Sequence, residues 1–348
     1  MKYKRLGRTG LHVSQLALGA MTFGESKELK ALGGVSEPDA HRFVAHAFEA
    51  GVNLFDTADA YSNGDSERIL GEALRRLGVP RESFLIATKG FGPMGQGPND
   101  MGASRAHLLD AAKASLKRLG VDHIDLYQIH GFDHATPMEE SLRALDDLVR
   151  QGHVRYVGVS NWAAWQIAKA LGISERLGLA SFASLQANYS LVCRDLEQEI
   201  APLLSSEGLG LLVWSPLAFG FLSGKQARNE KPAAGSRRAE MDFPLPDTER
   251  AFDILDVLRP IAEAHGASVA QVSLAWLLHR PVVSSVLVGA KHFEQLADNL
   301  KAVDIQLKDA DLRAIDEASR MQPLYPSWIM DVQARMLADA SGGRRERG

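Results

Sequence analysis

Four side chains in the first 130 residues have the types needed to transfer a proton to an oxygen atom. An acid, Asp56, is followed closely by a phenol, Tyr61, and then come an amine, Lys89, and an imidazole, His130. A tyrosine is a poor acid, with an ordinary pKa of about 10, and a neighbouring cation favours its phenolate form. Lys89 has that charge, and Asp56 can pair with Lys89 to hold it in place. A neutral His130 can donate a hydrogen bond to a carbonyl oxygen and orient it.

No nucleophilic cysteine or serine elbow accompanies these residues. A site of this kind protonates an oxygen while another species attacks the carbon, so we expect the attacking species to be a hydride from a cofactor. Each residue alone also has an ordinary structural explanation. Asp56 can cap a turn and Tyr61 can anchor a loop, while a lone lysine is commonly solvated and a lone histidine is more often structural.

Eight short apolar runs, each followed by an apolar pattern of helical period, are predicted to be β-strands. They cover residues 16–19, 53–56, 84–88, 124–130, 154–159, 184–188, 211–214 and 285–289. They do not alternate polar with apolar residues, which is typical of parallel strands covered on both faces. We therefore expect an α/β fold, a (β/α)8 TIM barrel, with a β-hairpin cover over residues 1–15 and extra helices near the carboxyl terminus. A doubly wound open sheet is the alternative, but no G-x-G-x-x-G follows a strand.

The carboxyl ends of barrel strands meet at one end of the sheet, where chemistry is placed. The residues at or just past these ends are Thr22, Asp56 with Tyr61, Lys89, His130, Ser160 with Asn161, Gln186, Ser215 and Gly289. Groups as different as Asp, Tyr, Lys and His at consecutive strand ends are difficult to explain by packing alone. We therefore predict one active site at this end of the barrel.

Length and composition fit one folded domain. The 348 residues are 45% hydrophobic and 24% charged, and no change in composition marks a linker. We expect a single barrel domain over residues 1–322 and a carboxyl-terminal segment over 323–348. Residues 323–330 are predicted to contribute to a substrate pocket, and residues 341–348 to be disordered. Ser36 and Thr136 are expected to cap two of the helices.

Several functional classes are disfavoured. A net charge of −4 gives no general attraction to nucleic acid or anionic lipid, and no apolar run approaches the ~18 residues of a membrane span. A single cysteine, Cys193, excludes an internal disulfide framework and fits a reducing cytoplasm. The amino terminus lacks the apolar run of a secretory signal. The sequence is compatible with a monomer or a homo-oligomer.

Metal and phosphate-loop sites are also disfavoured. His130 and His134 are four residues apart, but across a predicted strand-to-loop break, so we expect no metal site. Residues 220–226 have one residue too few for a Walker motif and a glutamine where the metal-binding hydroxyl belongs.

Motifs over most of the chain resemble those of the aldo-keto reductases, (β/α)8 barrels that use NADPH to reduce aldehydes and ketones. These motifs are Leu18–Gly24, Phe55–Tyr61, Lys89, Tyr127–His130, Gly158–Asn161, Trp214–Leu217 and Val288–Lys291, and the match covers roughly residues 3–322. The resemblance implies NADPH or NADP as cofactor, with NADH less suitable, and a small carbonyl compound as substrate. It implies Asp56, Tyr61, Lys89 and His130 as the catalytic tetrad, with Tyr61 as the general acid.

The resemblance also implies where the cofactor binds. Ser160, Asn161 and Gln186 would hold the nicotinamide, with Trp214 at the stacking position. Ser215 and Leu217 would run along the pyrophosphate. The residues expected around the adenosine are Gly289, Ala290, Lys291, Gln295, Asp298 and Asn299. The other expected cofactor contacts are Gly19, Met21, Thr22, Asp56, Pro216, Gly220, Leu222 and Lys225.

The substrate pocket is expected to be apolar and aromatic around Tyr61 and His130. Its candidate members are Phe23, Phe91, Phe132, Trp162, Phe219 and Trp328. For each aromatic residue taken singly, core packing explains its presence equally well.

Two positions depart from the family pattern. Lys291 stands where related proteins often have arginine, and Gln295 stands where a charged residue is usual. Lysine binds a 2′-phosphate as a point charge, without the bidentate fork of arginine. Loop lengths and residues 325–328 resemble the bacterial branch related to potassium-channel beta subunits, some of which have asparagine at the position of His130.

Three functions are compatible with these residues. The first is an NADPH-dependent carbonyl reductase, the second is an alcohol or sugar dehydrogenase that uses the same site, and the third is a cofactor-sensing interaction protein with vestigial chemistry. The intact tetrad favours an active enzyme.

Overall fold

Eight parallel strands close into a barrel in the computed structural model, which describes residues 1–25, 34–228, 230–232, 237–240 and 247–342. The strands are β3 (Leu16–Gly19), β4 (Leu54–Asp56), β5 (Leu85–Gly90), β6 (Ile124–Ile129), β7 (Val154–Ser160), β8 (Phe182–Asn188), β9 (Gly210–Trp214) and β10 (Val283–Val288). Neighbours in the chain pair from β3 to β9, and β10 closes the barrel between β9 and β3. The predicted (β/α)8 barrel is confirmed.

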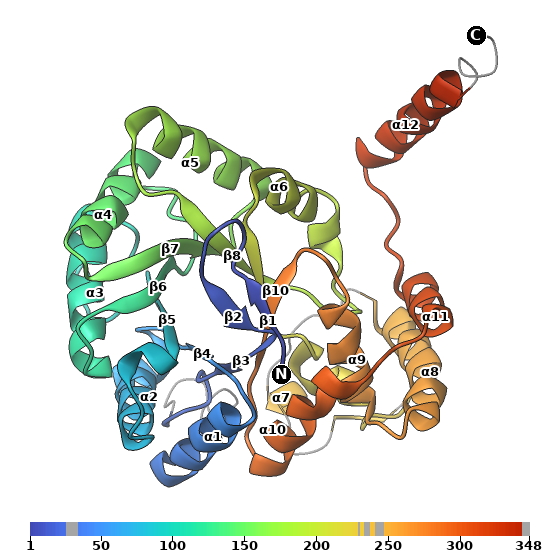
Figure 1. Ribbon diagram of the computed structural model, residues 1–348, viewed down its shortest axis with the longest axis horizontal. Helices are drawn as coiled ribbons and strands as arrows, with labels where there is room; N and C mark the ends of the chain where they lie inside the picture. The colour runs from blue at the N-terminus through green and yellow to red at the C-terminus, as the bar shows by residue number, and fades with distance from the viewer. Residues whose placement is uncertain (26–33, 229, 233–236, 241–246, 343–348) are drawn as a thin grey trace.

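Helices surround the barrel, and at least one follows each strand (Figure 1). Their bounds are α1 (Glu37–Glu49), α2 (Asp65–Arg76), α3 (Arg105–Leu119), α4 (Met138–Arg150), α5 (Ala164–Leu177), α6 (Ile200–Glu207), α7 (Arg237–Glu240), α8 (Thr248–Ala264), α9 (Val269–Leu278), α10 (Phe293–Leu300), α11 (Asp309–Ser319) and α12 (Ser327–Gly342). Within the described ranges, none of these helices is long and apolar enough to cross a bilayer.

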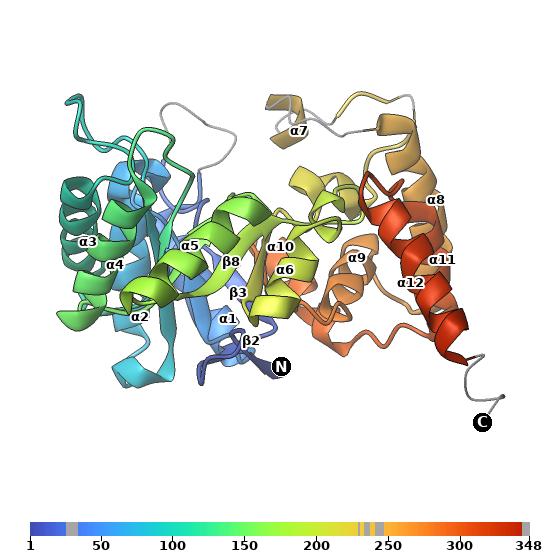
Figure 2. The ribbon, with the colours of Figure 1, turned by 90° about the horizontal axis from the view of Figure 1, so that it is seen from above.

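A two-stranded hairpin covers the amino-terminal end of the barrel, as predicted. Its strands are β1 (Tyr3–Arg5) and β2 (His12–Ser14). Leu6 and Val13 are fully buried in an apolar cluster with side chains from the barrel strands. The carboxamide of Asn53, just before β4, accepts the Ser14 backbone N–H at 2.7 Å. Figure 2 shows the hairpin and α7 at opposite ends of the molecule.

One predicted helix cap is confirmed and the other is wrong. The Ser36 hydroxyl accepts the backbone N–H of Asp39 at the start of α1. Thr136 instead donates its hydroxyl to the Asp133 carboxylate at 2.7 Å, and α4 begins only at Met138. The carboxylate, an ionised acceptor, holds the hydroxyl that would otherwise cap the helix.

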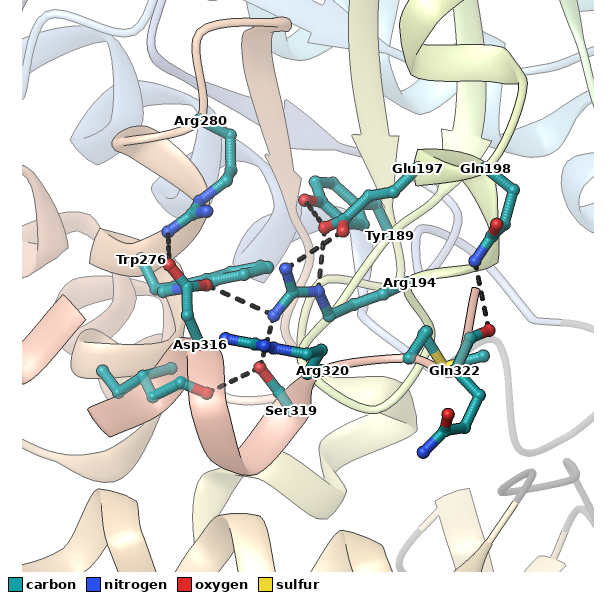
Figure 3. A network of polar contacts seen from close by, with 12 residues as sticks. Tyr189, Arg194, Glu197, Gln198, Trp276, Arg280, Asp316, Ser319, Arg320 and Gln322 are labelled. Carbon is teal, nitrogen blue, oxygen red and sulfur yellow. Dashed lines mark hydrogen bonds and ion pairs between the residues drawn. The ribbon is translucent and has the colours of Figure 1, made fainter. Parts of the chain in front are cut away.

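A partly buried network of polar contacts fixes α11 to the barrel (Figure 3). The guanidinium of Arg194, in the loop after β8, donates to Asp316 at 3.2 Å and to Ser319 at 2.6 Å. Arg280, which follows α9, donates to the other oxygen of Asp316. Helix α11 is therefore held from two sides.

Helix α12 differs from all the others because it stands apart from the barrel (Figure 1). The apolar side chains of Trp328 and Met336 are about half exposed or more. The helix continues to Gly342, and the rest of the segment predicted to be disordered, 343–348, lies outside the described residues.

Candidate active site

Three adjacent strands bring the predicted tetrad together. Asp56 is the last residue of β4, Lys89 is the last but one of β5, and His130 follows β6 directly. Tyr61 begins a short 3-10 helix after β4. Strands β4, β5 and β6 pair in parallel, so all four residues lie at the carboxyl-terminal end of the barrel.

A buried ion pair forms the centre of the site. Lys89 is fully buried, and its Nζ donates to Asp56 Oδ1 at 2.6 Å and to the Thr57 carbonyl at 2.7 Å. The same ammonium reaches Tyr61 Oη at 3.5 Å. The predicted pairing of Asp56 with Lys89 is confirmed, and it points the cation at the phenol.

Two amide side chains inside the barrel bind the second oxygen of Asp56. Gln186 Nε2 donates to Asp56 Oδ2 at 2.8 Å, and Gln128 Nε2 donates to the same oxygen at 3.3 Å. The sequence prediction missed Gln128. It lies two residues before His130 on β6, and the period of two in a strand places it on the same face of the sheet as Lys89, with which it is in register.

The phenol of Tyr61 stays protonated near neutral pH. Burial raises the pKa of Tyr61, and this outweighs the nearby Lys89 cation, which lowers it. Lys89 acts in the predicted direction, but the sequence prediction left out burial, which has the larger effect on the pKa of Tyr61. Burial also lowers the pKa of Lys89, but Asp56 and Tyr61 outweigh burial and raise it, so the amine is charged.

The imidazole of His130 is neutral. Burial, followed by the charge of Lys89, lowers the pKa of His130 to about 3. Its ring stands edge-on to Tyr61, with the ring centroids 5.5 Å apart. Within the described part of the chain the ring nitrogens have no hydrogen-bond partner, so a neutral N–H donor is available beside the phenol.

Two buried hydroxyls among the predicted cofactor contacts lack partners. Thr22 Oγ1 and Ser160 Oγ are buried, and neither has a hydrogen bond among the described residues. Unpaired buried polar groups are unfavourable unless a ligand or water binds them. The two hydroxyls follow or end β3 and β7 at the same end of the barrel, so they fit a polar ligand at that position.

Asn161 and Trp214 are already joined to the tetrad. Trp214 Nε1 donates to Asn161 Oδ1 at 3.0 Å, and Asn161 Nδ2 donates to the His130 carbonyl at 3.2 Å. A contact between the Asn161 carboxamide and a nicotinamide therefore has to replace or share one of these bonds. Gln186, the third predicted nicotinamide residue, has its amide nitrogen on Asp56.

Unusual backbone conformations follow three of the strands. In the described ranges, the non-glycine residues with left-handed φ are Ser62, Asn63, Asn161, Ser215, Ala218 and Phe219. They come after β4, β7 and β9, at the end of the barrel that holds the tetrad. Such conformations cost about 1–3 kcal/mol each and gather at functional sites, because the surrounding structure has to hold them in place.

The predicted pyrophosphate contacts, Ser215 and Leu217, lie in the loop after β9. The same loop contains the predicted cofactor contacts Pro216, Gly220, Leu222 and Lys225, whereas Gly19 ends β3 and Met21 follows it. Pro216 and Leu222 are buried, so they can present only backbone atoms, whereas Lys225 is exposed and can present its charge. Phe219 N–H bonds to the Ser215 hydroxyl at 3.4 Å, which helps to shape the turn.

The predicted adenosine contacts lie between β10 and the end of α10. They are Gly289, Ala290, Lys291, Gln295, Asp298 and Asn299. The Lys291 backbone N–H donates to Gln295 Oε1 at 3.2 Å. The side-chain amine of Lys291 takes no part in this hydrogen bond. Asp298 accepts the Ser268 hydroxyl and the Gln271 amide at 2.7 Å each, so its carboxylate also joins α10 to the start of α9.

Three of the predicted pocket aromatics are half-buried in loops that follow the strands, and the other three are not. Phe91 and Phe132 come after β5 and β6, and Phe219 lies in the loop after β9. Trp162 is buried in the core, edge-on to Phe132 at 4.9 Å and to Phe182 at 5.7 Å. Phe23 is fully buried against Phe43 of α1 and is a core residue. Trp328 lies on α12, about half exposed beside Tyr325, so the structure does not bring it to the tetrad.

No group of three or more His, Cys, Asp or Glu side chains in the described ranges is arranged to hold a metal ion. The site offers a protonated phenol, a buried cation and a neutral imidazole within a few ångströms. This arrangement can deliver a proton to an oxygen atom and stabilise the anion that remains.

Comparisons with known proteins point to one family. The model of the Aldo/keto reductase family matches residues 15–320. A probable voltage-gated potassium channel subunit beta of Oryza sativa subsp. japonica is 41% identical over 310 residues, which cover 88% of this chain and 92% of that protein. The uncharacterized oxidoreductase YrpG of Bacillus subtilis is 37% identical, over 91% of this chain and 95% of that protein. The versiconal hemiacetal acetate reductase of Aspergillus parasiticus is 33% identical, over 94% of this chain and 99% of that protein.

Proposed function

Since this chain belongs to the aldo/keto reductase family, we propose that it reduces an aldehyde or ketone to an alcohol, with NADPH as the reductant and Tyr61 as the proton donor. One observation carries the proposal: the fully buried ammonium of Lys89 lies between the carboxylate of Asp56 and the hydroxyl of Tyr61. Family membership supports carbonyl reduction in general. The cofactor and the role of Tyr61 are the parts that the proposal adds.

The tetrad residues divide the work on the carbonyl oxygen. His130 donates a hydrogen bond from its neutral ring and orients the oxygen toward Tyr61. Tyr61 then donates its proton to that oxygen, and Lys89 stabilises the phenolate that forms. Asp56 does not handle the proton; it keeps Lys89 charged and in place.

The residues at the strand ends fit a nicotinamide dinucleotide. When bound, the reduced nicotinamide supplies a hydride to the carbonyl carbon. Ser160, Asn161 and Gln186 would hold the ring, and the unpaired hydroxyls of Ser160 and Thr22 support a polar ligand there. The loop after β9 with Lys225 would hold the pyrophosphate. Lys291 would bind the 2′-phosphate, which supports NADPH over NADH.

The test is a turnover assay with the full chain. NADPH oxidation is followed with a panel of aldehydes and ketones, and NADH is run in parallel. We expect turnover with at least one carbonyl compound and a lower rate or weaker binding with NADH. Absence of turnover across the panel contradicts the proposal.

A second function is favoured by the names of several relatives. Proteins of rice and of Arabidopsis thaliana, 41% and 38% identical, are named as probable potassium channel beta subunits. A cofactor-sensing interaction protein with vestigial activity is therefore the second candidate. It predicts tight NADPH binding without turnover, whereas a dehydrogenase predicts faster oxidation of alcohols or sugars with NADP than reduction of the carbonyl panel.

A further inference from the structure

A second group of buried polar side chains lies behind the tetrad, on the outer face of the sheet. Thr88 and Tyr127 are in register across β5 and β6, one residue before the inward-facing pair Lys89 and Gln128, so they point to the opposite face. Asp59 joins them from the loop after β4. Asp59, Thr88 and Tyr127 are fully buried. None of the three has a part in the proposed chemistry.

Glu67, on α2, belongs to the same group, and each of its carboxylate oxygens accepts a hydrogen bond. Glu67 is fully buried and accepts the Thr88 hydroxyl at 2.5 Å and Arg118 Nε, from α3, at 2.6 Å. The charge of Glu67 is thus compensated by a partner on a neighbouring helix.

Only one oxygen of the Asp59 carboxyl group has a hydrogen-bond donor among the described residues. Its Oδ1 accepts the backbone N–H of Ala60 at 2.6 Å. Its Oδ2 is buried without a partner among the described residues, and so is the hydroxyl of Tyr127. The phenol fills the space beside Gly90, where an added Cβ would lie only 2.1 Å from the hydroxyl oxygen.

Asp59 also links the loop that carries Tyr61 to β5. It lies between Asp56 and Tyr61 in the chain, and its backbone N–H donates to the Lys89 carbonyl at 3.0 Å. Its carboxyl group accepts the Ala60 N–H and so fixes the turn that leads to Tyr61. The direction of the Tyr61 hydroxyl therefore depends on how firmly Asp59 holds this turn against β5.

We propose that Asp59 is a positioning residue whose ionisable carboxyl group holds the turn before Tyr61 against β5, so that turnover depends on the protonation state of a side chain that touches neither substrate nor cofactor. The inference rests on the proposed function only for its turnover readout. The geometry that carries it is the bond from Ala60 to the carboxyl group, the backbone bond from Asp59 to Lys89, and the buried second oxygen without a partner among the described residues.

The charges around Asp59 set the direction of the effect. Glu67 on α2, Arg118 on α3, Tyr127 on β6 and Tyr61 on the same loop are the titratable groups that face it. Burial, then Glu67, raises the pKa of Asp59 to about 7, and Arg118 opposes them. The ionised form is the stronger acceptor of backbone N–H groups. Turnover should therefore rise as Asp59 loses its proton.

Folding stability should change in the opposite direction. A carboxyl group whose pKa is higher in the folded chain than in the unfolded chain binds its proton more tightly when folded. Its contribution is present at low pH and is lost as pH rises from about 4 through about 7. This gives a readout of Asp59 titration that needs no substrate.

The test compares the wild-type chain with Asp59→Asn and Asp59→Ala. Asparagine keeps an acceptor for the backbone N–H of Ala60 but cannot ionise, and alanine removes both. The control is Asp125→Asn, which alters another buried aspartate that accepts a backbone N–H, from Ile86, near the start of β6. For each variant we measure kcat against pH, the unfolding midpoint against pH, and hydrogen exchange of the peptide that covers residues 57–64.

The expected results differ between the variants. In the wild type and in Asp125→Asn, kcat rises between pH 6 and pH 8 and the unfolding midpoint falls. In Asp59→Asn both dependences flatten. In Asp59→Ala kcat falls about tenfold at every pH, since small displacements of a reacting group have costs of this order, and residues 57–64 exchange faster.

Two results overturn the inference. One is an Asp59→Asn variant that keeps the wild-type pH dependence of both kcat and stability. The other is an Asp59→Ala variant whose residues 57–64 exchange at the wild-type rate. Hydrogen exchange and unfolding need no turnover. A chain that is inactive on every carbonyl compound would therefore refute the proposed function, while these two measurements would still test the positioning role of Asp59.

Discussion

Replacing Lys89 by methionine removes the buried cation and leaves the rest of the site in place. The apolar stem of the side chain is retained, so packing between β4 and β6 changes little. Asp56 keeps its two amide donors, Gln128 and Gln186, on the other oxygen. What is lost is the positive charge 3.5 Å from Tyr61 Oη.

The expected loss follows from that distance. Two unit charges 3.5 Å apart interact by about 5 kcal/mol at an effective dielectric constant of about 20. Each ~1.4 kcal/mol lost in the transition state lowers the rate tenfold. If between half and all of the phenolate charge has developed in the transition state, kcat for Lys89→Met falls by roughly 50-fold to roughly 3,000-fold.

The assay is steady-state turnover with NADPH and the best carbonyl substrate of the panel. The control is Lys4→Met, because Lys4 is a part-buried lysine whose Nζ also donates to backbone carbonyls, those of Leu278 and Val283 at the opposite end of the barrel. Lys4→Met should lose stability and keep its kcat. A folded Lys89→Met variant that keeps kcat within about threefold of the wild type, less than ~1 kcal/mol, refutes the electrostatic role of Lys89.

Three further predictions concern the imidazole, the cofactor phosphate and the α11 anchor. His130→Phe should lower kcat/KM about 100-fold, as for loss of one preorganised donor, while His130→Gln, which keeps a donor, should lose less; equal losses would argue against hydrogen-bond donation. Lys291→Met should weaken NADPH binding about tenfold through loss of one charge-assisted contact and leave NADH binding unchanged in fluorescence titrations. An equal effect on both cofactors would contradict the proposed contact between Lys291 and the 2′-phosphate. Arg194→Met leaves Glu197 and Asp316 without their shared cation, although Asp316 keeps Arg280. Because both carboxylates are partly exposed, the free energy of unfolding should fall by about 1–2 kcal/mol at unchanged kcat, as measured by urea denaturation; an unchanged midpoint would show that the network does not stabilise α11.

The barrel could be predicted because parallel strands buried on both faces are visible as short apolar runs. The ends of these runs carry Asp56, Lys89 and His130, and the topology rule for barrels brings such ends together. The pairing of Asp56 with Lys89 followed from charge alone. Local patterns and one rule of topology were therefore enough to predict the centre of the site.

Contacts that depend on three-dimensional packing could not be predicted in the same way. Gln128 lies within a strand rather than at its end, so a survey of strand ends does not find it. Burial decides the protonation of Tyr61, and the depth of burial depends on the whole fold. Phe23 is an aromatic residue just after a barrel strand, as expected of a pocket residue, but it packs against Phe43, which lies on α1.

Local competition and chain direction explain the other differences. Thr136 has the spacing of a helix cap, but the Asp133 carboxylate three residues earlier takes its hydroxyl. Trp328 was expected near the substrate, yet the direction of the chain after the α11 anchor carries it away with α12. The direction taken by a segment after its last fixed contact leaves no local signal in the sequence.

The proposed role of Tyr61 is tested most directly by Tyr61→Phe. This variant removes one hydroxyl and leaves Lys89, Asp56 and His130 in place. We predict that kcat falls by about 100-fold to 10,000-fold, the range for loss of a general acid, while the Kd for NADPH is unchanged in a fluorescence titration of the same preparation. Turnover at the wild-type rate would contradict the account.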